Sequence, residues 1–169
     1  MTKIDLATLR LRPGEVRRQR VDATLDPFVL GGQRYELLPH PAVADLEVSE
    51  ASGALVFTLS LDATLSGPCM RCLGHAELPL HVSSREFHDP SAARSDELHS
   101  DYVVADQLDV SAWARDLVAL ELPEQIVCRE DCAGLCPVCG KDLNVEPHEH
   151  TERVADPRWA ALEQLREEL

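Results

Sequence analysis

Four cysteines within twelve residues constrain the fold of this chain more than any other feature of its sequence. They are Cys128, Cys132, Cys136 and Cys139, in the stretch CREDCAGLCPVCG. Thiolates at this density are typical ligands of a structural zinc ion, which takes four of them in a tetrahedron and leaves no position for water or substrate. The spacing therefore predicts a structural centre and not a reaction centre.

The second pair of these thiols has the form of a zinc knuckle. Pro137 fixes one backbone φ between them, and Gly140 permits the positive φ that the turn after the second thiol uses. Gly134 lets the chain reverse between the two pairs. We predict one Zn²⁺, bound by all four thiolates, in a compact knuckle over residues 126–144.

Cys69 and Cys72 add a C-x-x-C pair far upstream. Three interpretations stay open: free thiols at the tip of a hairpin, alternative zinc ligands that face Cys136 and Cys139, or a redox dithiol. Redox dithiols of the thioredoxin type accompany a βαβ pattern, which this sequence does not show, so the redox interpretation is the least favoured.

Another class of site competes for the same residues. Cys132, Cys136 and Cys139 match the three-cysteine spacing that binds a [4Fe–4S] cluster in radical SAM enzymes. This interpretation leaves Cys128 unused, and the alternating strands upstream favour an antiparallel sheet over the strand–helix barrel of such enzymes. A thiol- or metal-dependent enzyme, of the radical SAM or redox type, is the alternative to a non-enzymatic protein.

Other catalytic signals are weak. His148 and His150 form an H-x-H pair that could bind a metal ion, but a lone H-x-H in an acidic segment is a weak signal, and we expect solvated side chains. The sequence shows neither a Ser/His/Asp order, nor a phosphate-binding loop, nor a glycine-rich nucleotide fingerprint. We predict that the protein is not an enzyme.

Hydrophobic periodicity indicates an antiparallel sheet. Apolar residues occupy every second position from Leu55 to Leu65, which predicts a long strand with one buried face. Shorter alternations at 44–48 and 76–82 predict its neighbours, whereas the prolines and glycines of 26–41 indicate loops.

Two helices complete the predicted fold. Asp109 and Pro123 bound one near 110–122, and Asp156 begins another near 156–168. We predict an α+β fold with an antiparallel, curved or barrel-like sheet, a packed helix, a C-terminal Cys-rich zinc knuckle and a terminal helix. The expected parts, within one folded unit, are a β-rich body with its helix, the knuckle, and a linker with the C-terminal helix, at residues 1–125, 126–144 and 145–169.

Charge and hydropathy limit the partners. The net charge of −14 disfavours electrostatic binding of the whole surface to an RNA backbone. No apolar run approaches the roughly 20 residues that span a bilayer, and the start has no signal-peptide apolar segment, so we expect a cytoplasmic protein without a membrane partner. Thiols stay reduced in the cytoplasm, which favours metal ligation over disulfides.

Basic residues gather in one arm near the start of the chain. This basic arm is the segment suited to contact RNA or an acidic protein, although a solvated strand edge has the same composition. Its arginines are Arg10, Arg12, Arg17, Arg18 and Arg20.

Four motifs, in order along the chain, together point to one known family. They are Pro13-Gly14, Cys69-x-Arg71-Cys72, Gly134-Leu135-Cys136-Pro137-x-Cys139-Gly140 and Asp156-Pro157-Arg158-Trp159. In this order they resemble the YceD family, the large ribosomal RNA subunit accumulation proteins. The resemblance implies a role in the accumulation or processing of large-subunit (23S) ribosomal RNA in the cytoplasm, and it implies no known catalytic activity.

The expected function is that of a non-enzymatic ribosome-biogenesis factor. We expect it to bind large-subunit rRNA, a basic large-subunit ribosomal protein, or both. Arg71, between two thiols, is a candidate contact residue together with the basic arm, and a salt bridge to a neighbouring carboxylate is its alternative role. Charge complementarity favours the basic protein as partner of the acidic body.

Overall fold

The structure is a computed structural model that describes residues 2–9, 11–12, 14–92 and 98–150. The predicted terminal helix near 156–168 and the side chain of Arg10 lie outside the described residues. The predicted division of the chain into three parts stays a prediction.

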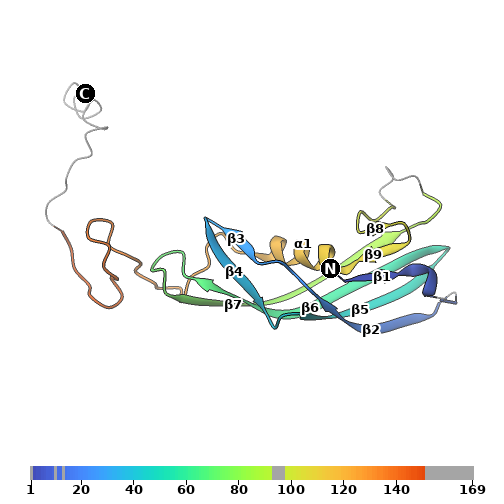
Figure 1. Cartoon of the computed structure of the whole chain (residues 1–169), viewed down its shortest axis with the longest axis horizontal. Coiled ribbons are helices and arrows are strands. Elements are labelled where there is room, and N and C mark those ends of the chain that lie inside the picture. Colours follow the sequence, from blue (N-terminus) through green and yellow to red (C-terminus); the bar gives the residue numbers. More distant parts are fainter. Residues whose placement is uncertain (1, 10, 13, 93–97, 151–169) are drawn as a thin grey trace, which may run out of the picture.

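One antiparallel sheet forms most of the molecule (Figure 1). Its strands are β2 (Val16–Ala23), β3 (Phe28–Leu30), β4 (Gln33–Leu38), β5 (Ala42–Ala51), β6 (Ala54–Pro68) and β7 (His75–His88). The predicted antiparallel sheet is confirmed. The range 26–41, where the sequence predicts loops, contains β3 and β4.

Across the sheet the six strands lie side by side in four antiparallel rows, and two of these rows consist of two shorter strands each. β7 pairs with β6 along one edge of β6, while β5 and β4 pair in tandem along the other edge. β2 then pairs with β5 and β3 with β4, which gives the outermost row. Because β7 is not paired with β2 or β3, the sheet is not closed into a barrel, which is one of the two forms that the sequence predicts.

Alternation along the strands buries one face of the sheet. In β6 every second side chain from Phe57 to Leu65 is buried, as the sequence predicts. Leu61 lies at the centre of a row, opposite Ala44 of β5 and Val82 of β7, and all three are buried. Asp62, on the other face, is exposed. We call this the outer face.

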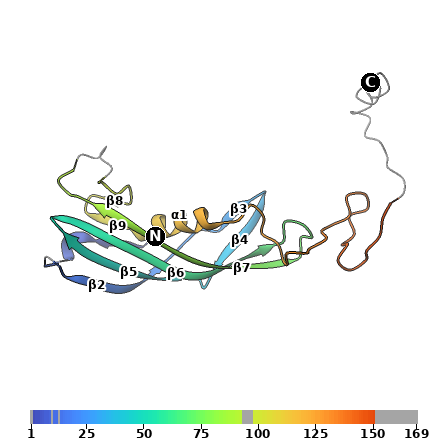
Figure 2. The same cartoon turned by 180° about the vertical axis from the view of Figure 1, so that it is seen from behind.

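A single α-helix among the described residues covers the buried face (Figure 2). It is α1 (Val110–Glu121), and the prediction of a helix near 110–122 is confirmed. The Asp109 side chain caps it by accepting a hydrogen bond from the Ala112 amide at 3.0 Å. Trp113, only 1% exposed, anchors the helix in the core.

Short elements close the end of the sheet near the N-terminus. They form a three-stranded sheet and one turn of 3-10 helix, namely β1 (Lys3–Asp5), β8 (Val103–Val104), β9 (Gln107–Asp109) and η1 (Leu6–Thr8). Across the described ranges, none of the helices combines the length and the apolar character that crossing a membrane requires.

Candidate metal centres

The turn between β6 and β7 carries the first group of thiols. Cys69 and Cys72 lie in this turn, and the chain returns to it after α1 with Cys128 and Cys132. The four Sγ atoms lie within 4.8 Å of one another. We call these four residues the sheet-end cluster.

Backbone contacts bring the two segments together. The Met70 amide donates to the Ile126 carbonyl at 2.8 Å, and the side chain of Ile126 is buried. Within the turn, the Leu73 amide donates to the Cys69 carbonyl at 2.9 Å, while Leu73 itself has a positive φ of 60°. These contacts set the sulfur atoms of both segments toward a common point.

The distances within the sheet-end cluster suit a tetrahedral ion. Sγ of Cys69 lies 3.8 Å from Sγ of Cys132, and Sγ of Cys72 lies 3.7 Å from Sγ of Cys128. A tetrahedron with metal–sulfur bonds of about 2.3 Å has sulfur–sulfur edges of about 3.8 Å. The four sulfurs therefore match a closed four-thiolate site.

Opposing effects set the sulfur pKa values in this cluster. Burial raises the pKa of Cys69, but hydrogen bonds from the backbone of Cys72, Arg71 and Cys128 outweigh it and lower the pKa to about 6. Desolvation, followed by contacts with the other thiols, raises the pKa of Cys128 to about 12. One thiolate thus forms easily and the last forms with difficulty, unless a cation among the sulfurs offsets their mutual repulsion.

Arg71 holds the two segments of the sheet-end cluster together. Its guanidinium donates to the carbonyls of Glu130 and Cys132, at 3.4 and 3.2 Å, and to the side-chain oxygen of Gln125 at 3.1 Å. Its own carbonyl accepts from the Leu135 amide at 3.0 Å. Among the described residues, Arg71 therefore has neutral oxygen partners, and the carboxylate partner of the alternative interpretation is not found there.

Cys136 and Cys139 belong to a second group. Their Sγ atoms and the ring nitrogens of His148 and His150 lie within 4.8 Å of one another, and we call these four residues the terminal cluster. The Gly140 amide donates to the Cys136 carbonyl at 2.9 Å, and Gly140 has the positive φ that the sequence predicts, at 74°. The C-x-x-C-G turn therefore has the form of a knuckle.

The thiol and imidazole of the terminal cluster interact directly. Sγ of Cys139 lies 3.1 Å from Nε2 of His148. Hydrogen bonds from the backbone of Cys139, followed by those of Val138, lower the pKa of Cys136 to about 6. The backbone carbonyl of Glu146, followed by the thiol of Cys136, raises the pKa of His148.

The structure distributes the four predicted zinc ligands over both clusters. Cys128 and Cys132 join Cys69 and Cys72, which were predicted as alternative ligands, whereas Cys136 and Cys139 join the two histidines. His148 and His150 were not among the predicted ligands; their signal in the sequence is an H-x-H pair a few residues after a C-x-x-C pair. All six cysteines are free.

The arginines of the basic arm have different surroundings. Arg18 and Arg20 lie on the outer face and pair with acidic residues of β5, Glu47 at 2.8 Å and Asp45 at 3.2 Å. Arg12 and Arg17 are exposed, and within the described ranges neither guanidinium has an ion pair. Two of the five arginines of the basic arm are thus locally neutralised.

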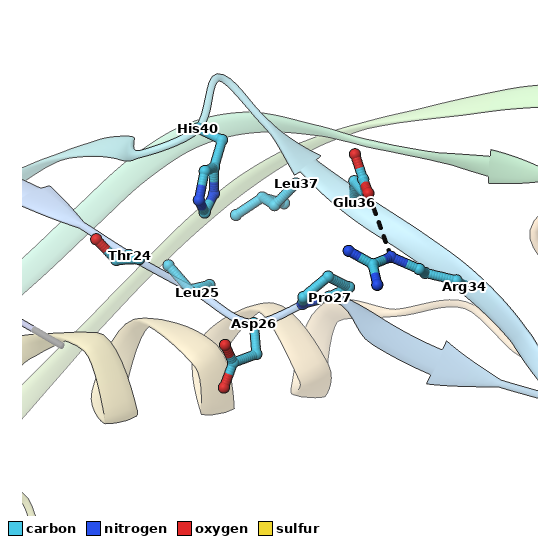
Figure 3. A pocket seen from close by; sticks show the side chains of 8 residues that line it. All are labelled: Thr24, Leu25, Asp26, Pro27, Arg34, Glu36, Leu37 and His40. Atoms are coloured by element: carbon cyan, nitrogen blue, oxygen red, sulfur yellow. Dashed lines mark hydrogen bonds and ion pairs between the residues drawn. The ribbon is translucent and has the colours of Figure 1, made fainter.

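A pocket beside β4 is a further candidate site (Figure 3). Its volume is about 220 Å³, below the roughly 300–1,000 Å³ of typical ligand sites. Among its lining residues, Arg34 and Glu36 pair with each other at 3.2 Å, and His40 lines the opposite side. Arg34 and Glu36 neutralise each other, and Asp26 adds one negative charge to the lining. Because the pocket is small and no thiol lines it, it is a weaker candidate than the clusters.

Comparisons with known proteins give a consistent result. Residues 57–166, which include both clusters, match the family model described as large ribosomal RNA subunit accumulation protein YceD. An uncharacterized protein of Mycobacterium tuberculosis is 35% identical over 170 residues, covering 96% of this chain and 80% of the relative. The uncharacterized protein YlbN of Bacillus subtilis is 36% identical over 115 residues, covering 63% of this chain and 66% of YlbN.

A plant relative carries a descriptive name. The chloroplastic large ribosomal RNA subunit accumulation protein YCED homolog 1 of Arabidopsis thaliana is 34% identical over 63 residues, covering 37% of this chain and 20% of the homolog. No solved structure matches the chain.

Proposed function

Because this chain belongs to the YceD family of large ribosomal RNA subunit accumulation proteins, we propose that it is a non-enzymatic factor that supports the accumulation or processing of 23S rRNA in the cytoplasm. The observation that carries this proposal is the match to the family model over the part of the chain that holds both clusters. In this function the clusters are scaffolding.

The geometry of the clusters supports a non-enzymatic role. Each cluster offers four protein ligands, and a four-coordinate ion so enclosed has no open position for a substrate. The radical SAM alternative needs Cys132 together with Cys136 and Cys139, but Cys132 belongs to the other cluster. That separation counts against the enzymatic alternative.

Zn²⁺ is the proposed occupant of the sheet-end cluster. Its four ligands are all thiolates, which are soft donors that select zinc among the common structural cations. The bound ion would fix the segment after α1 to the β6–β7 turn, because two of its ligands come from each segment. Zinc would thereby define the shape of this end of the molecule.

A basic large-subunit ribosomal protein is the proposed direct partner. The net charge of −14 repels a phosphate backbone and attracts a basic protein. Pairing of Arg18 and Arg20 with Glu47 and Asp45 further reduces the positive surface that an RNA would need. Charge complementarity of this kind mainly raises the rate of association.

Salt-dependent binding tests this proposal. The full chain is mixed with isolated large-subunit proteins and, separately, with 23S rRNA fragments, at about 0.05 M and about 0.5 M salt. We expect binding to a basic protein that weakens at high salt and is further weakened by Asp62→Lys, which reverses an exposed charge of the outer face. The matched control is Arg17→Ala, which removes an exposed positive charge.

The possible outcomes separate the partners. Binding to rRNA that Arg17→Ala weakens, without binding to proteins, would replace the proposed partner by RNA. Binding to neither would contradict both forms of the proposal.

A further inference from the structure

We propose that the terminal cluster is a second metal site, separate from the sheet-end cluster, which binds its own Zn²⁺ or similar divalent cation through two thiolates and two imidazoles. Its ligands are Cys136, Cys139, His148 and His150. The chain would then hold two ions, one in an all-sulfur site and one in a mixed site. This second site stands independently of the proposed role in rRNA accumulation.

The donor atoms of the terminal cluster lie close enough together to bind one small tetrahedral ion. All four lie within 4.8 Å of one another, and Sγ of Cys139 lies 3.1 Å from Nε2 of His148. Metal–sulfur bonds of about 2.3 Å and metal–nitrogen bonds of about 2.0 Å place tetrahedral ligands about 3.5 Å apart. The cluster needs only small shifts to enclose an ion.

A hydrogen bond orients one imidazole toward this common point. Nδ1 of His148 lies 2.7 Å from the backbone carbonyl of Glu146, which can only accept a hydrogen bond. Nδ1 therefore carries the proton in the neutral ring, and Nε2 presents its lone pair to the thiols. Metal-bound histidines in proteins are fixed by the same kind of contact.

Contacts within the loop between the thiols and the histidines hold its two ends close together. Nζ of Lys141 lies 2.9 and 3.0 Å from the two carboxylate oxygens of Glu146. The Cys136 amide donates to the Lys141 carbonyl at 2.8 Å, and Leu135 forms an isolated bridge with Asp142. These contacts bring His148 back to the knuckle, so the ligand set does not depend on chance proximity in an extended chain.

The two clusters are linked but do not share ligands. The side-chain amide of Asn144 donates to Sγ of Cys132 at 3.5 Å, and its oxygen accepts from the Ala133 amide at 2.8 Å. Asn144 thus ties the terminal loop to the sheet-end cluster while each cluster keeps four ligands of its own. Cys139 and His150 are exposed, whereas Cys69 and Cys132 are buried, so we expect the terminal ion to exchange faster.

Metal stoichiometry tests the second site. The full chain, free of any histidine tag, is reconstituted with Zn²⁺, desalted and examined by native mass spectrometry. We expect two ions per chain, and one ion in either His148→Ala/His150→Ala or Cys69→Ser/Cys72→Ser. The matched control is His75→Ala/His81→Ala, which removes two exposed histidines of β7 and should keep both ions.

Co²⁺ substitution keeps the test decisive if a variant folds poorly. The wild-type chain loaded with two Co²⁺ should show the overlapping spectra of an all-sulfur site and a mixed sulfur–nitrogen site, and His148→Ala/His150→Ala should lose the mixed component alone. A single ion in the wild type, or two ions in the histidine variant, would overturn the proposal.

Discussion

Arg71 acts, at the scale of one residue, as the link between the two segments of the sheet-end cluster. Its guanidinium reaches Gln125, Glu130 and Cys132. Arg71→Ala should lower the free energy of unfolding by about 1–3 kcal/mol, because these oxygens lose a charged donor. Urea denaturation measures the change, with Arg85→Ala, an exposed arginine of β7, as control. Equal stability of the two variants would show that Arg71 is free to serve as a surface contact instead.

Gly134 permits the chain to pass close to Arg71. It has a φ of 78°, and a Cβ added there would lie 3.1 Å from the Arg71 carbonyl oxygen. Gly134→Ala should therefore lower the stability by more than the roughly 1 kcal/mol that the positive φ alone costs. Gly53→Ala is the control, because Gly53 has a φ of 88° and open space around it. Similar losses in both variants, measured in urea, would mean that the close approach has no energetic effect.

His88 should make the stability of the protein depend on pH. It is 4% exposed and its Nδ1 has no hydrogen-bond partner among the described residues. Burial, then the nearby His99, lowers its pKa in the folded state below the usual 6.5. As the pH falls below about 6.5, the unfolded chain therefore takes up the proton first, and the free energy of unfolding decreases.

The variant His88→Gln isolates this effect. Both proteins contain the same metal ligands, so the difference between them in urea denaturation at about pH 7 and about pH 5 reports on His88 alone. We expect the wild type to lose more stability than the variant on acidification. A loss of the same size in both would contradict the assignment.

At the scale of elements, β6 joins the sheet to the thiol-bearing turn. Gly67 lies near its end, where any Cβ would collide with the ring of Tyr35 from β4. The Tyr35 side chain is fully buried and its hydroxyl donates to the Pro68 carbonyl at 2.7 Å, one residue before Cys69. The packing of β4 on β6 therefore positions the first ligand of the sheet-end cluster.

Gly67→Ala should displace Tyr35 and weaken this end of the sheet. We expect a loss of about 1–3 kcal/mol in the free energy of unfolding, as for other overpacked positions. The Gly67→Ala/Tyr35→Leu double variant, which replaces the ring by a smaller side chain, should recover part of the loss. No loss in the single variant would contradict the close packing.

The elements differ in how well the sequence predicts them. The alternation from Leu55 to Leu65 predicts β6 and its buried face, because a period of two is local information. Gly31, Gly32 and three prolines around β4 predict a loop there, although its buried Tyr35 and Leu37 follow the same alternation. Its short pairing with β6 is a tertiary contact that propensity does not reveal.

Ligand grouping depends on contacts between distant residues. Cys69 and Cys132 are 63 positions apart, and the meeting of their sulfurs follows from the path of the chain around α1. The spacing of the C-terminal thiols predicts the turn at Cys136 and Cys139, with its positive φ at Gly140, but it does not reveal which other residues lie beside these thiols. The H-x-H pair of His148 and His150 is a weak signal in the sequence, and only the structure places both rings beside Cys136 and Cys139.

At the scale of the whole molecule, one long sheet carries two thiol clusters beyond one of its ends (Figure 1). The apolar core under α1 reaches the sheet-end cluster, because Cys69, Ile126 and Cys132 belong to it. Leu122 and Val127 pack against the same core. A metal ion in the sheet-end cluster would add to this apolar packing a bond between the β6–β7 turn and the chain after α1.

The most direct test of this account measures zinc content and thermal unfolding together in the wild type, Cys69→Ser/Cys72→Ser and a Met70→Leu control, whose substitution lies in the same turn. We predict that the double variant loses the sheet-end zinc and that its Tm falls by about 5 °C or more, while Met70→Leu keeps both values. A chelator should lower the Tm of the wild type toward that of the double variant. Unchanged zinc content and unchanged Tm in Cys69→Ser/Cys72→Ser would contradict the central claim that a metal ion holds this end of the molecule together.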